Sequence, residues 1–251
     1  MAEPLTLILI GVVFLLAGAI KGVVGMGLPT VSLALLVLLL DLPTAMALIL
    51  LPSFITNVWQ AIVGGSWLAI LRRSPEFFIL AIGGVWLGGR ALGSVDQSLL
   101  SALLGFLIVL YGASGLANYR ITLGPTQERP AGTVAGFVNG VLTGMTGSFA
   151  FPGVLYLKAL GLKREELIQG MGILFTLSTI GLAISLQSNA LLSTKLLVMS
   201  SVGLVPAVLG MMFGQRIRNR MSEIMFSRVF LAALVLLGVY IAVSSVIRFS
   251  G

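Results

Sequence analysis

Two glycine-rich motifs hold the residues best suited to contact a small solute. The first is Gly22-Val-Val-Gly-Met-Gly-Leu-Pro29, and the second half of the chain repeats its pattern as Gly140-Val-Leu-Thr-Gly-Met-Thr-Gly147, with Pro152 shortly after. Glycine permits open backbone geometry and proline removes a backbone donor, so each motif predicts an interrupted helix. Within a membrane, an interrupted helix exposes N–H groups and the positive end of a helix dipole, and both favour an anion.

Polar side chains accompany the motifs, and transporters place substrate at such breaks in corresponding positions of two repeats. The alternative is that the glycines only allow close helix packing. On the first interpretation we expect the substrate to contact Lys21, Gly22, Gly25, Gly27, Pro29, Thr30, Asn57, Arg90, Asn139, Gly140, Thr143, Gly144, Thr146, Gly147, Ser148, Pro152 and Thr176.

Lys21 is the one charged residue between positions 5 and 40, and it directly precedes the first motif. Burying a lysine charge at the centre of a bilayer costs about 2.5 to 3.5 kcal/mol on insertion scales. The side chain therefore either extends its amine to the membrane surface or contributes charge to a site. Its counterpart in the second half is Asn139, so this charge belongs to one half only.

Three other candidates have equally plain structural alternatives. Arg90 can meet an oxyanion through two parallel hydrogen bonds, or it can anchor a helix end at the membrane surface. Asn57 and Thr176 lie on matching segments and can line a path, or they can bond a neighbouring helix or their own backbone.

The acidic residues and the absent residue types exclude several functions. All eight carboxylates fall at segment ends or in loops, namely Glu3, Asp41, Glu76, Asp96, Glu128, Glu165, Glu166 and Glu223. A cation pathway, a carboxylate proton relay and an intramembrane aspartyl protease therefore lack their ligands. The chain has no Cys and no His, which excludes thiol catalysis, haem attachment and Cys/His zinc sites. We expect no enzyme activity, no metal and no cofactor.

Composition indicates a membrane protein throughout. Hydrophobic residues make up 58% of the chain and charged residues only 9%, against roughly 25% charged in soluble domains. The net charge of +7 comes from Lys and Arg placed singly or in short groups between apolar segments, so nucleic acid is not expected as a partner.

Ten apolar segments are expected to be helices, because the backbone must bond internally in lipid. They lie near 5–22, 28–40, 43–63, 76–94, 98–117, 132–146, 149–161, 165–186, 193–213 and 226–247. Besides the glycine motifs, Arg90 and Arg216 follow glycines at matching entries, and Gly112 matches Gly238. Three matches in one order indicate an internal duplication: 1–117 as a first repeat, 118–131 as a linker and 132–251 as a second repeat.

The distribution of positive charge favours an inverted duplication. If 5–40 and 132–161 each return the chain to its starting side, ten charges share one side, namely Arg72, Arg73, Arg120, Arg129, Lys158, Lys163, Arg164, Arg216, Arg218 and Arg220. Only Arg90, Lys195 and Arg248 lie on the other side. Single crossings would give six against seven. The positive-inside rule therefore predicts a cytoplasmic linker and periplasmic termini. Whether those stretches are short full spans or re-entrant hairpins stays open.

The first glycine motif, its looser repeat at 140–152, the linker and the length together resemble the sulfite exporter TauE/SafE family over nearly the whole chain. The resemblance implies movement of sulfite, sulfoacetate and other small organosulfur anions across the bacterial inner membrane, usually outward. The fold class is an all-α polytopic membrane protein of two inverted repeats, each of about five helical segments, interrupted or re-entrant at the glycine motifs.

The expected function is a secondary transporter that works by alternating access, with the anion near the midplane between the two breaks. No Walker loop is present, so a gradient or a partner protein must supply energy. The lipid bilayer is the expected surrounding of the protein. Whether it forms a homodimer and whether H⁺ or Na⁺ is a coupling ion stay open. The alternatives are a transporter of another small anion and a membrane subunit that scaffolds a complex without transport.

Overall fold

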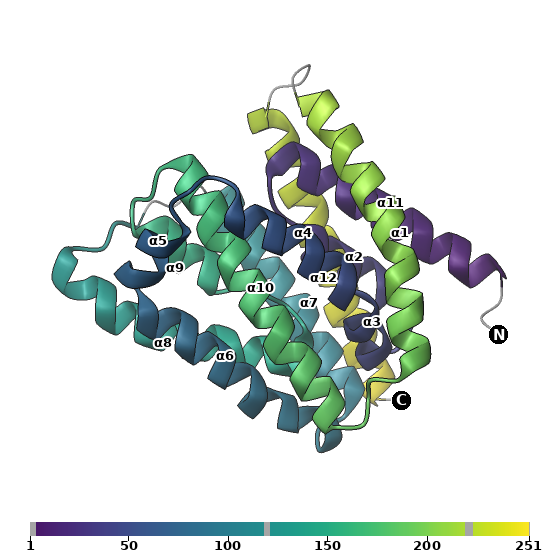
Figure 1. Ribbon diagram of the computed structural model, residues 1–251. Coiled ribbons are helices and arrows are strands. Elements are labelled where there is room, and N and C mark those ends of the chain that lie inside the picture. Colours follow the sequence, from purple (N-terminus) through teal and green to yellow (C-terminus); the bar gives the residue numbers. More distant parts are fainter. Residues whose placement is uncertain (1–3, 118–120, 219–222, 251) are drawn as a thin grey trace.

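The protein is helical throughout the residues that the computed structural model describes, which are 4–117, 121–218 and 223–250 (Figure 1). These residues form twelve α-helices and one 3₁₀ turn, without a strand. Six helical stretches are long and apolar enough to cross a membrane: Leu5–Val24, Pro75–Gly93, Gln97–Leu116, Arg164–Ser188, Thr194–Arg218 and Met225–Ser250. This confirms the expected all-α polytopic fold.

The first half contains α1 (Pro4–Val24), α2 (Leu28–Leu36), α3 (Leu42–Leu48), α4 (Leu50–Ile62), α5 (Trp67–Arg73), α6 (Pro75–Gly89), η1 (Arg90–Gly93) and α7 (Gln97–Leu116). The second half contains α8 (Pro125–Thr146), α9 (Gly153–Ala159), α10 (Arg164–Ser188), α11 (Thr194–Arg218) and α12 (Glu223–Ser250). Each of the ten expected segments has a counterpart here. Helix α5 was not expected, and α3 and α4 form one stretch bent by 44°.

Both glycine motifs interrupt their helices, as expected. Helix α1 ends before Gly25 and α2 starts after Gly27, and these two glycines have left-handed φ angles of 84° and 106°. Helix α8 ends at Gly147, whose φ of 73° is also left-handed, and α9 starts at Gly153. A residue with a Cβ is strained at such angles, which is why glycine ends these helices.

The helices that follow the two breaks are too short to cross a bilayer. Helix α2 has 9 residues and α9 has 7, so they rise about 13 Å and about 10 Å in a hydrocarbon core of about 30 Å. Nearly every residue of α2 is buried within the protein. Irregular backbone at membrane depth is tolerated only in such protein-covered positions. The lengths of α2 and α9 therefore do not fit the short full spans that the sequence left open, whereas α1 is long enough to cross a membrane.

The expected linker is shorter than its polar composition indicated. Helix α8 begins at Pro125, so only part of 118–131 is non-helical, and 118–120 lie outside the described residues. Proline suits a first helical turn, and the Gly124 N–H donates to Gln127 Oε1 at 3.1 Å. Ion pairs join Arg73 to Glu128 at 2.7 Å and Arg129 to Glu76 at 2.6 Å. These polar residues therefore begin a helix that α5 and α6 hold in place.

The main helix contacts pair the two halves reciprocally. Helix α1 packs along α11, and its second-half counterpart α8 packs along α6, the counterpart of α11. Helix α4 packs against its counterpart α10, and α7 against its counterpart α12 (Figure 1). Exchanging the halves therefore reproduces the same set of contacts. This is the pairing that a duplicated chain would make.

Glycines bring the backbones of α1 and α11 together, and glycines four residues apart do the same between α8 and α6. A Cβ at Gly22 would lie 2.2 Å from the Met211 carbonyl oxygen, and one at Gly214 would lie 2.1 Å from that of Ala19. In the second half, a Cβ at Gly140 would lie 2.3 Å from the Ala81 oxygen, and one at Gly144 would lie 2.2 Å from that of Val85. At these positions the glycines of the motifs thus serve close helix packing, which was the alternative interpretation.

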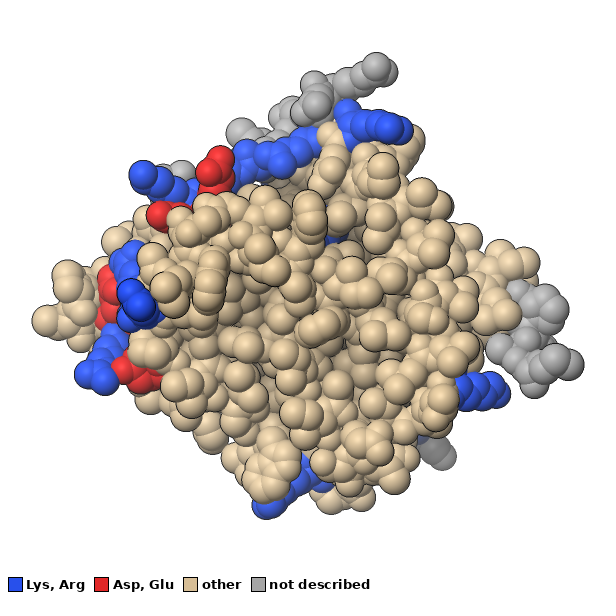
Figure 2. Space-filling view, in the orientation of Figure 1, with Lys and Arg blue, Asp and Glu red and all other residues tan. Residues whose placement is uncertain are grey.

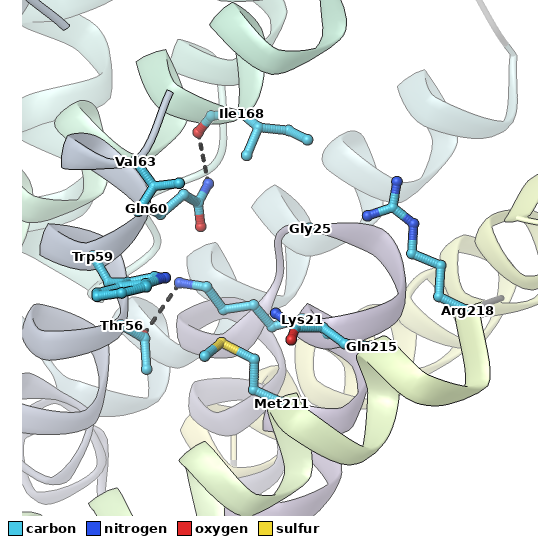
Figure 3. A pocket seen from close by; sticks show the side chains of 11 residues that line it. Lys21, Gly25, Thr56, Trp59, Gln60, Val63, Ile168, Met211, Gln215 and Arg218 are labelled. Atoms are coloured by element: carbon cyan, nitrogen blue, oxygen red, sulfur yellow. Dashed lines mark hydrogen bonds between the residues drawn. The ribbon is translucent and has the colours of Figure 1, made fainter. Parts of the chain in front are cut away.

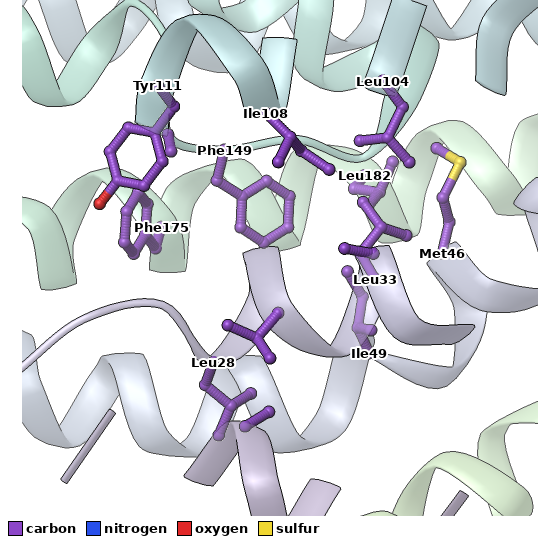
Figure 4. Packing of buried hydrophobic residues seen from close by; sticks show 14 of the residues in the cluster. Leu28, Leu33, Met46, Ile49, Leu104, Ile108, Tyr111, Phe149, Phe175 and Leu182 are labelled. Atoms are coloured by element: carbon purple, nitrogen blue, oxygen red, sulfur yellow. The ribbon is translucent and has the colours of Figure 1, made fainter. Parts of the chain in front are cut away.

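Apolar side chains fill the interior between the two breaks (Figure 4). Leu28 and Leu33 of α2 lie with Met46 of α3, Phe149 of the second break and Phe175 of α10 in one buried cluster. A Cβ at Gly147 would lie 2.8 Å from Met46 Cγ. The core thus occupies the space between the breaks, where the sequence led us to expect substrate.

Charged side chains lie at two opposite edges of the visible face. Figure 2 shows most of them along the upper left edge, a few along the bottom edge and at the lower right, and a broad, almost uncharged surface between. In the same view, α8 begins at the left, whereas α1 begins and α12 ends at the lower right (Figure 1). Arg120 and Arg220, counted in the charge distribution above, lie outside the described residues. An uncharged band between two charged rims is the surface that a bilayer requires.

We predict that Gly88→Ala lowers stability and Gly83→Ala does not, although both lie in α6. A Cβ at Gly88 would lie 2.0 Å from the Val141 carbonyl oxygen, whereas nothing lies within 4 Å of one at Gly83. Overpacking costs about 1 to 3 kcal/mol, while alanine in an open helical position gains about 0.5 to 1 kcal/mol over glycine. Thermal unfolding in detergent measures both, and equal melting temperatures for the two variants would contradict the packing role.

Candidate functional site

A cavity of about 280 Å³ lies beside the first break, between α1, α4, α10 and α11 (Figure 3). Helices from both halves therefore contribute to it. Its walls combine basic, amide, aromatic and aliphatic side chains, and they are formed by Lys21, Gly22, Gly25, Thr56, Trp59, Gln60, Val63, Ile168, Met211, Gln215 and Arg218.

Lys21 is the buried charge of this cavity. Its side chain is 4% exposed, and its Nζ donates hydrogen bonds to Thr56 Oγ1 at 3.1 Å and to Asn57 Oδ1. The side chain thus turns inward against α4. The alternative, in which the amine extends to the membrane surface, does not describe this structure. No described carboxylate is buried, and Glu3 and the side chain of Glu223 lie outside the described residues. Buried charges without an ionic partner are uncommon in proteins.

A bend between α3 and α4 positions the two acceptors of Lys21. Pro52 has no N–H, so the carbonyl of Leu48 lacks its usual helical donor. Ser200 of α11 donates to that carbonyl at 2.7 Å and accepts the Leu51 N–H at 3.1 Å. Ser200 therefore replaces the missing bond, and it connects α11 to the start of α4.

Two glutamines fix the far end of α4 against α10. Gln60 Nε2 donates to the Ile168 carbonyl at 2.7 Å, as Figure 3 shows. Gln169 Nε2 donates to the Ala61 carbonyl at 2.8 Å, while its Oε1 accepts the Ser66 N–H at 2.9 Å. The Gln169 bond satisfies the Ala61 carbonyl at the end of α4, where carbonyls have no helical partner. Together these bonds hold the cavity wall at its contact between the two halves.

The polar side chains of the second break stabilise the break itself. Asn139 Oδ1 accepts the Gly153 N–H at 2.9 Å, and Thr143 Oγ1 donates to the Ser148 carbonyl at 2.8 Å. Thr146 Oγ1 donates to the Leu142 carbonyl at 2.7 Å within its own helix. The second break thus forms its own capped turn, and the cavity described above has no residue from it.

The structure separates the sequence candidates into groups. Lys21, Gly22 and Gly25 line the cavity, and Asn57 holds Lys21. Gly27, Pro29 and Thr30 start α2 beside the break, and Pro152 immediately precedes α9. Gly140, Gly144 and Gly147 face other helices or the core, as described above.

Arg90 and Thr176 have structural roles instead of contacts with the cavity. Arg90 is exposed, and its Cζ lies 4.2 Å from the ring centroid of Trp86. Thr176 Oγ1 donates to the Gly172 carbonyl of its own helix at 2.7 Å. A guanidinium stacked on an exposed tryptophan is typical of a helix end at a membrane surface.

The contributions of α10 and α11 to the cavity were not identified from the sequence. Ile168 of α10 contributes to one wall of the cavity, and the last turns of α11 contribute Met211, Gln215 and Arg218 (Figure 3). The only available signal was the repeated glycine spacing at Gly210 and Gly214, which brings α11 against α1. Pairing α11 with α1 from that spacing would have indicated these residues.

The donors in this site suit an anion or another hydrogen-bond acceptor. Among the described residues, the Nδ2 of Asn57 is buried without a partner, directly beside the group that holds Lys21. A buried donor left unpaired is unfavourable, and a bound acceptor would satisfy it. The buried Lys21 amine and the Arg218 guanidinium on the cavity wall therefore suit an oxyanion.

We predict that Asn57→Leu lowers stability by about 1 to 3 kcal/mol, because it leaves the buried Lys21 ammonium with one acceptor fewer. In a Lys21→Met background the same substitution should cost less, since the donor is gone. A double-mutant cycle of thermal unfolding in detergent measures this coupling. Equal costs in both backgrounds would show that Asn57 does not hold Lys21.

Comparisons with known proteins give one result. The family model for the sulfite exporter TauE/SafE matches residues 10–241, which is nearly the whole chain. No curated protein and no solved structure matched. The match includes both glycine motifs, the bent α3–α4 stretch and every helix that lines the cavity. The chain is therefore a member of the sulfite exporter TauE/SafE family, a family of membrane transporters.

Proposed function

We propose that the protein is a secondary transporter that exports small organosulfur anions, such as sulfite or sulfoacetate, and that the cavity at Lys21 binds them. Family membership supports transport of sulfur oxyanions. The observation that carries the proposal is a 4% exposed lysine with neutral hydrogen-bond partners on the wall of a cavity of about 280 Å³. Sulfite and sulfonate groups supply the negative charge and the several acceptor oxygens that such a site lacks.

Side chains hold the anion in this proposal, rather than main-chain donors between two breaks. The left-handed Gly25 ends α1 about one turn after Lys21, so no further helical turn covers the cavity there. The second break lies against Met46 and Leu33 of the core. Its role is to shape the second half, and the buried charge of the site, Lys21, comes from the first half.

The reciprocal pairing of the two halves supports alternating access. The cavity lies between α1, α4, α10 and α11, and exchanging the halves turns these into α8, α10, α4 and α6. At that equivalent place the helices are closed, because Asn189 Nδ2 donates to the Gly89 carbonyl at 3.2 Å, and a Cβ at Gly89 would lie 1.7 Å from Ser185 Oγ. In the opposite-facing state, α6 separates from α10 there while α11 closes the present cavity.

The direction in which the cavity faces follows from the proposed topology. The protein spans the bacterial inner membrane several times, with the 118–124 connection in the cytoplasm and both termini in the periplasm. Arg218 at the mouth of the cavity belongs to the side that carries most of the basic residues. The described state is therefore the one that loads from the cytoplasm.

We predict that Lys21→Ala abolishes anion transport, whereas Lys195→Ala does not. Lys195 is an exposed lysine at the start of α11, away from the residues that line the cavity. Removing Lys21 leaves the anion without its buried counter-charge in a low-dielectric site. The measurement is counterflow of labelled sulfite and of sulfoacetate in proteoliposomes.

Wild-type counterflow of neither sulfite nor sulfoacetate would contradict the proposed substrates. Counterflow that Lys21→Ala leaves intact would contradict the proposed site. A protein that carries none of these anions, yet is needed to assemble a complex, would be the scaffolding subunit considered from the sequence.

We predict that a cysteine at Gln215 is labelled from the cytoplasmic side and that substrate protects it. The chain contains no cysteine, so Gln215→Cys introduces a single reactive thiol on the cavity wall. Membrane-impermeant maleimide should react in inside-out vesicles and more slowly when sulfoacetate is added. The exposed position Thr126→Cys serves as a control for sidedness, because it lies in the first turn of α8. Labelling of Gln215→Cys from the opposite side to Thr126→Cys would exclude the proposed orientation.

A further inference from the structure

The hydrogen bonds of Lys21 match an uncharged amine better than an ammonium. The Oγ1 of Thr56 donates its own hydrogen to the Pro52 carbonyl at 2.7 Å, so toward Lys21 it acts only as an acceptor. Asn57 offers its Oδ1, which is also only an acceptor. These two acceptors satisfy the two N–H groups of a neutral amine, whereas a lysine ammonium has three N–H donors. The third N–H has no protein acceptor among the described residues.

No negative charge of the described protein faces Lys21. The cavity walls are formed by Thr56, Trp59 and Gln60 of α4, by Ile168 of α10, and by Met211, Gln215 and Arg218 of α11. Asn57 of α4 accepts a hydrogen bond from Lys21. From its own helix and the break, the other residues that line the cavity are Gly22 and Gly25, and neither carries a charge. Among the described lining residues, the one other titratable group is the guanidinium of Arg218, which is positive. The described part of the cavity therefore holds no counter-charge for Lys21, and a bound anion would supply one.

We propose that Lys21 also carries a proton, so that transport of the anion is coupled to H⁺ moving in the same direction. This inference rests on the proposed transport function. In the loaded state the Nζ ammonium donates its third N–H to the anion, and the ion pair shields the lysine charge while the halves rearrange. After the anion leaves, the N–H⁺ bond breaks, its electron pair stays on nitrogen and water on the release side takes the proton.

The empty carrier then returns with a neutral amine that donates to Thr56 and Asn57 alone. On the loading side, water supplies a proton to Nζ and the next anion binds. A charged lysine without an anion is unfavourable in a closed, apolar interior. Return of the protonated empty form is therefore suppressed, and this is what couples the proton to the anion.

Proteoliposomes that contain sulfoacetate and a trapped pH dye test this coupling. Two rates are compared: exchange of labelled for unlabelled sulfoacetate, and net efflux into sulfoacetate-free buffer. Exchange needs only the loaded carrier, whereas net efflux needs the empty carrier to return. Both acidic groups of sulfoacetate are ionised at neutral pH, so the anion itself brings no proton. For the wild type we expect net efflux to remove about one proton per anion from the lumen, because one amine carries one proton.

Lys21→Arg provides the decisive variant. An arginine keeps the charge but does not lose its proton in proteins. We expect the ratio of net efflux to exchange to fall by about tenfold or more relative to the wild type, whatever the change in the exchange rate itself. Lys195→Arg makes the same change at an exposed position and should alter neither rate.

Absence of sulfoacetate exchange in the wild type would overturn the proposed function and this inference with it. Wild-type exchange with net efflux that moves no protons would overturn proton coupling alone, as would a Lys21→Arg variant whose ratio of net efflux to exchange equals that of the wild type. If Lys21→Arg fails to fold, the proton count of the wild type still decides the question.

Discussion

The hydrogen bonds from Lys21 to Thr56 and Asn57 are the interaction on which the site depends. A lysine within a membrane protein needs polar partners, and here both come from the two turns of α4 that follow Pro52. The bend between α3 and α4 places those turns, and Ser200 of α11 satisfies the backbone that the bend leaves open. The position of one amine thus depends on three helices, two from the first half and one from the second.

Glycine contacts let those helices approach one another closely. Lys21 directly precedes Gly22, whose packing on Met211 brings α11 against α1 with almost no side chain between them. Met211 and Gln215 consequently reach the same cavity as Lys21. The same spacing recurs between α8 and α6, where the packed glycines lead to a closed contact at Gly89. The same glycine packing therefore occurs beside an open cavity in the α1–α11 pair and beside a closed contact in the α8–α6 pair. An alternating-access carrier needs this asymmetry.

Local features of the sequence predicted the fold well. The apolar segments, the two helix breaks and the helix-end positions of Asp41 and Asp96 follow from hydropathy and from the geometry of glycine and proline. Lys21 was identified because a charge in an apolar stretch needs an explanation.

The composition of the cavity was harder to predict, because it depends on contacts between distant segments. Gln169 meets the end of α4 across more than 100 residues of sequence, and Ser200 meets Leu48 across 152. Glycine spacing alone does not distinguish a helix break from a packing surface. Gly22 packs on the backbone of α11, whereas Gly25, three residues later, ends α1 with a left-handed φ angle. Only the tertiary pairing of α1 with α11 separates the two roles.

Crystals grown with selenite would test the central claim most directly, because selenite has the shape and charge of sulfite and selenium gives an anomalous signal. An anomalous peak within about 4.5 Å of Lys21 Nζ, the sum of a charge-assisted hydrogen bond to an oxyanion and one Se–O bond, is the result expected. A peak elsewhere in the membrane-embedded part, with the Lys21 cavity empty, would contradict it.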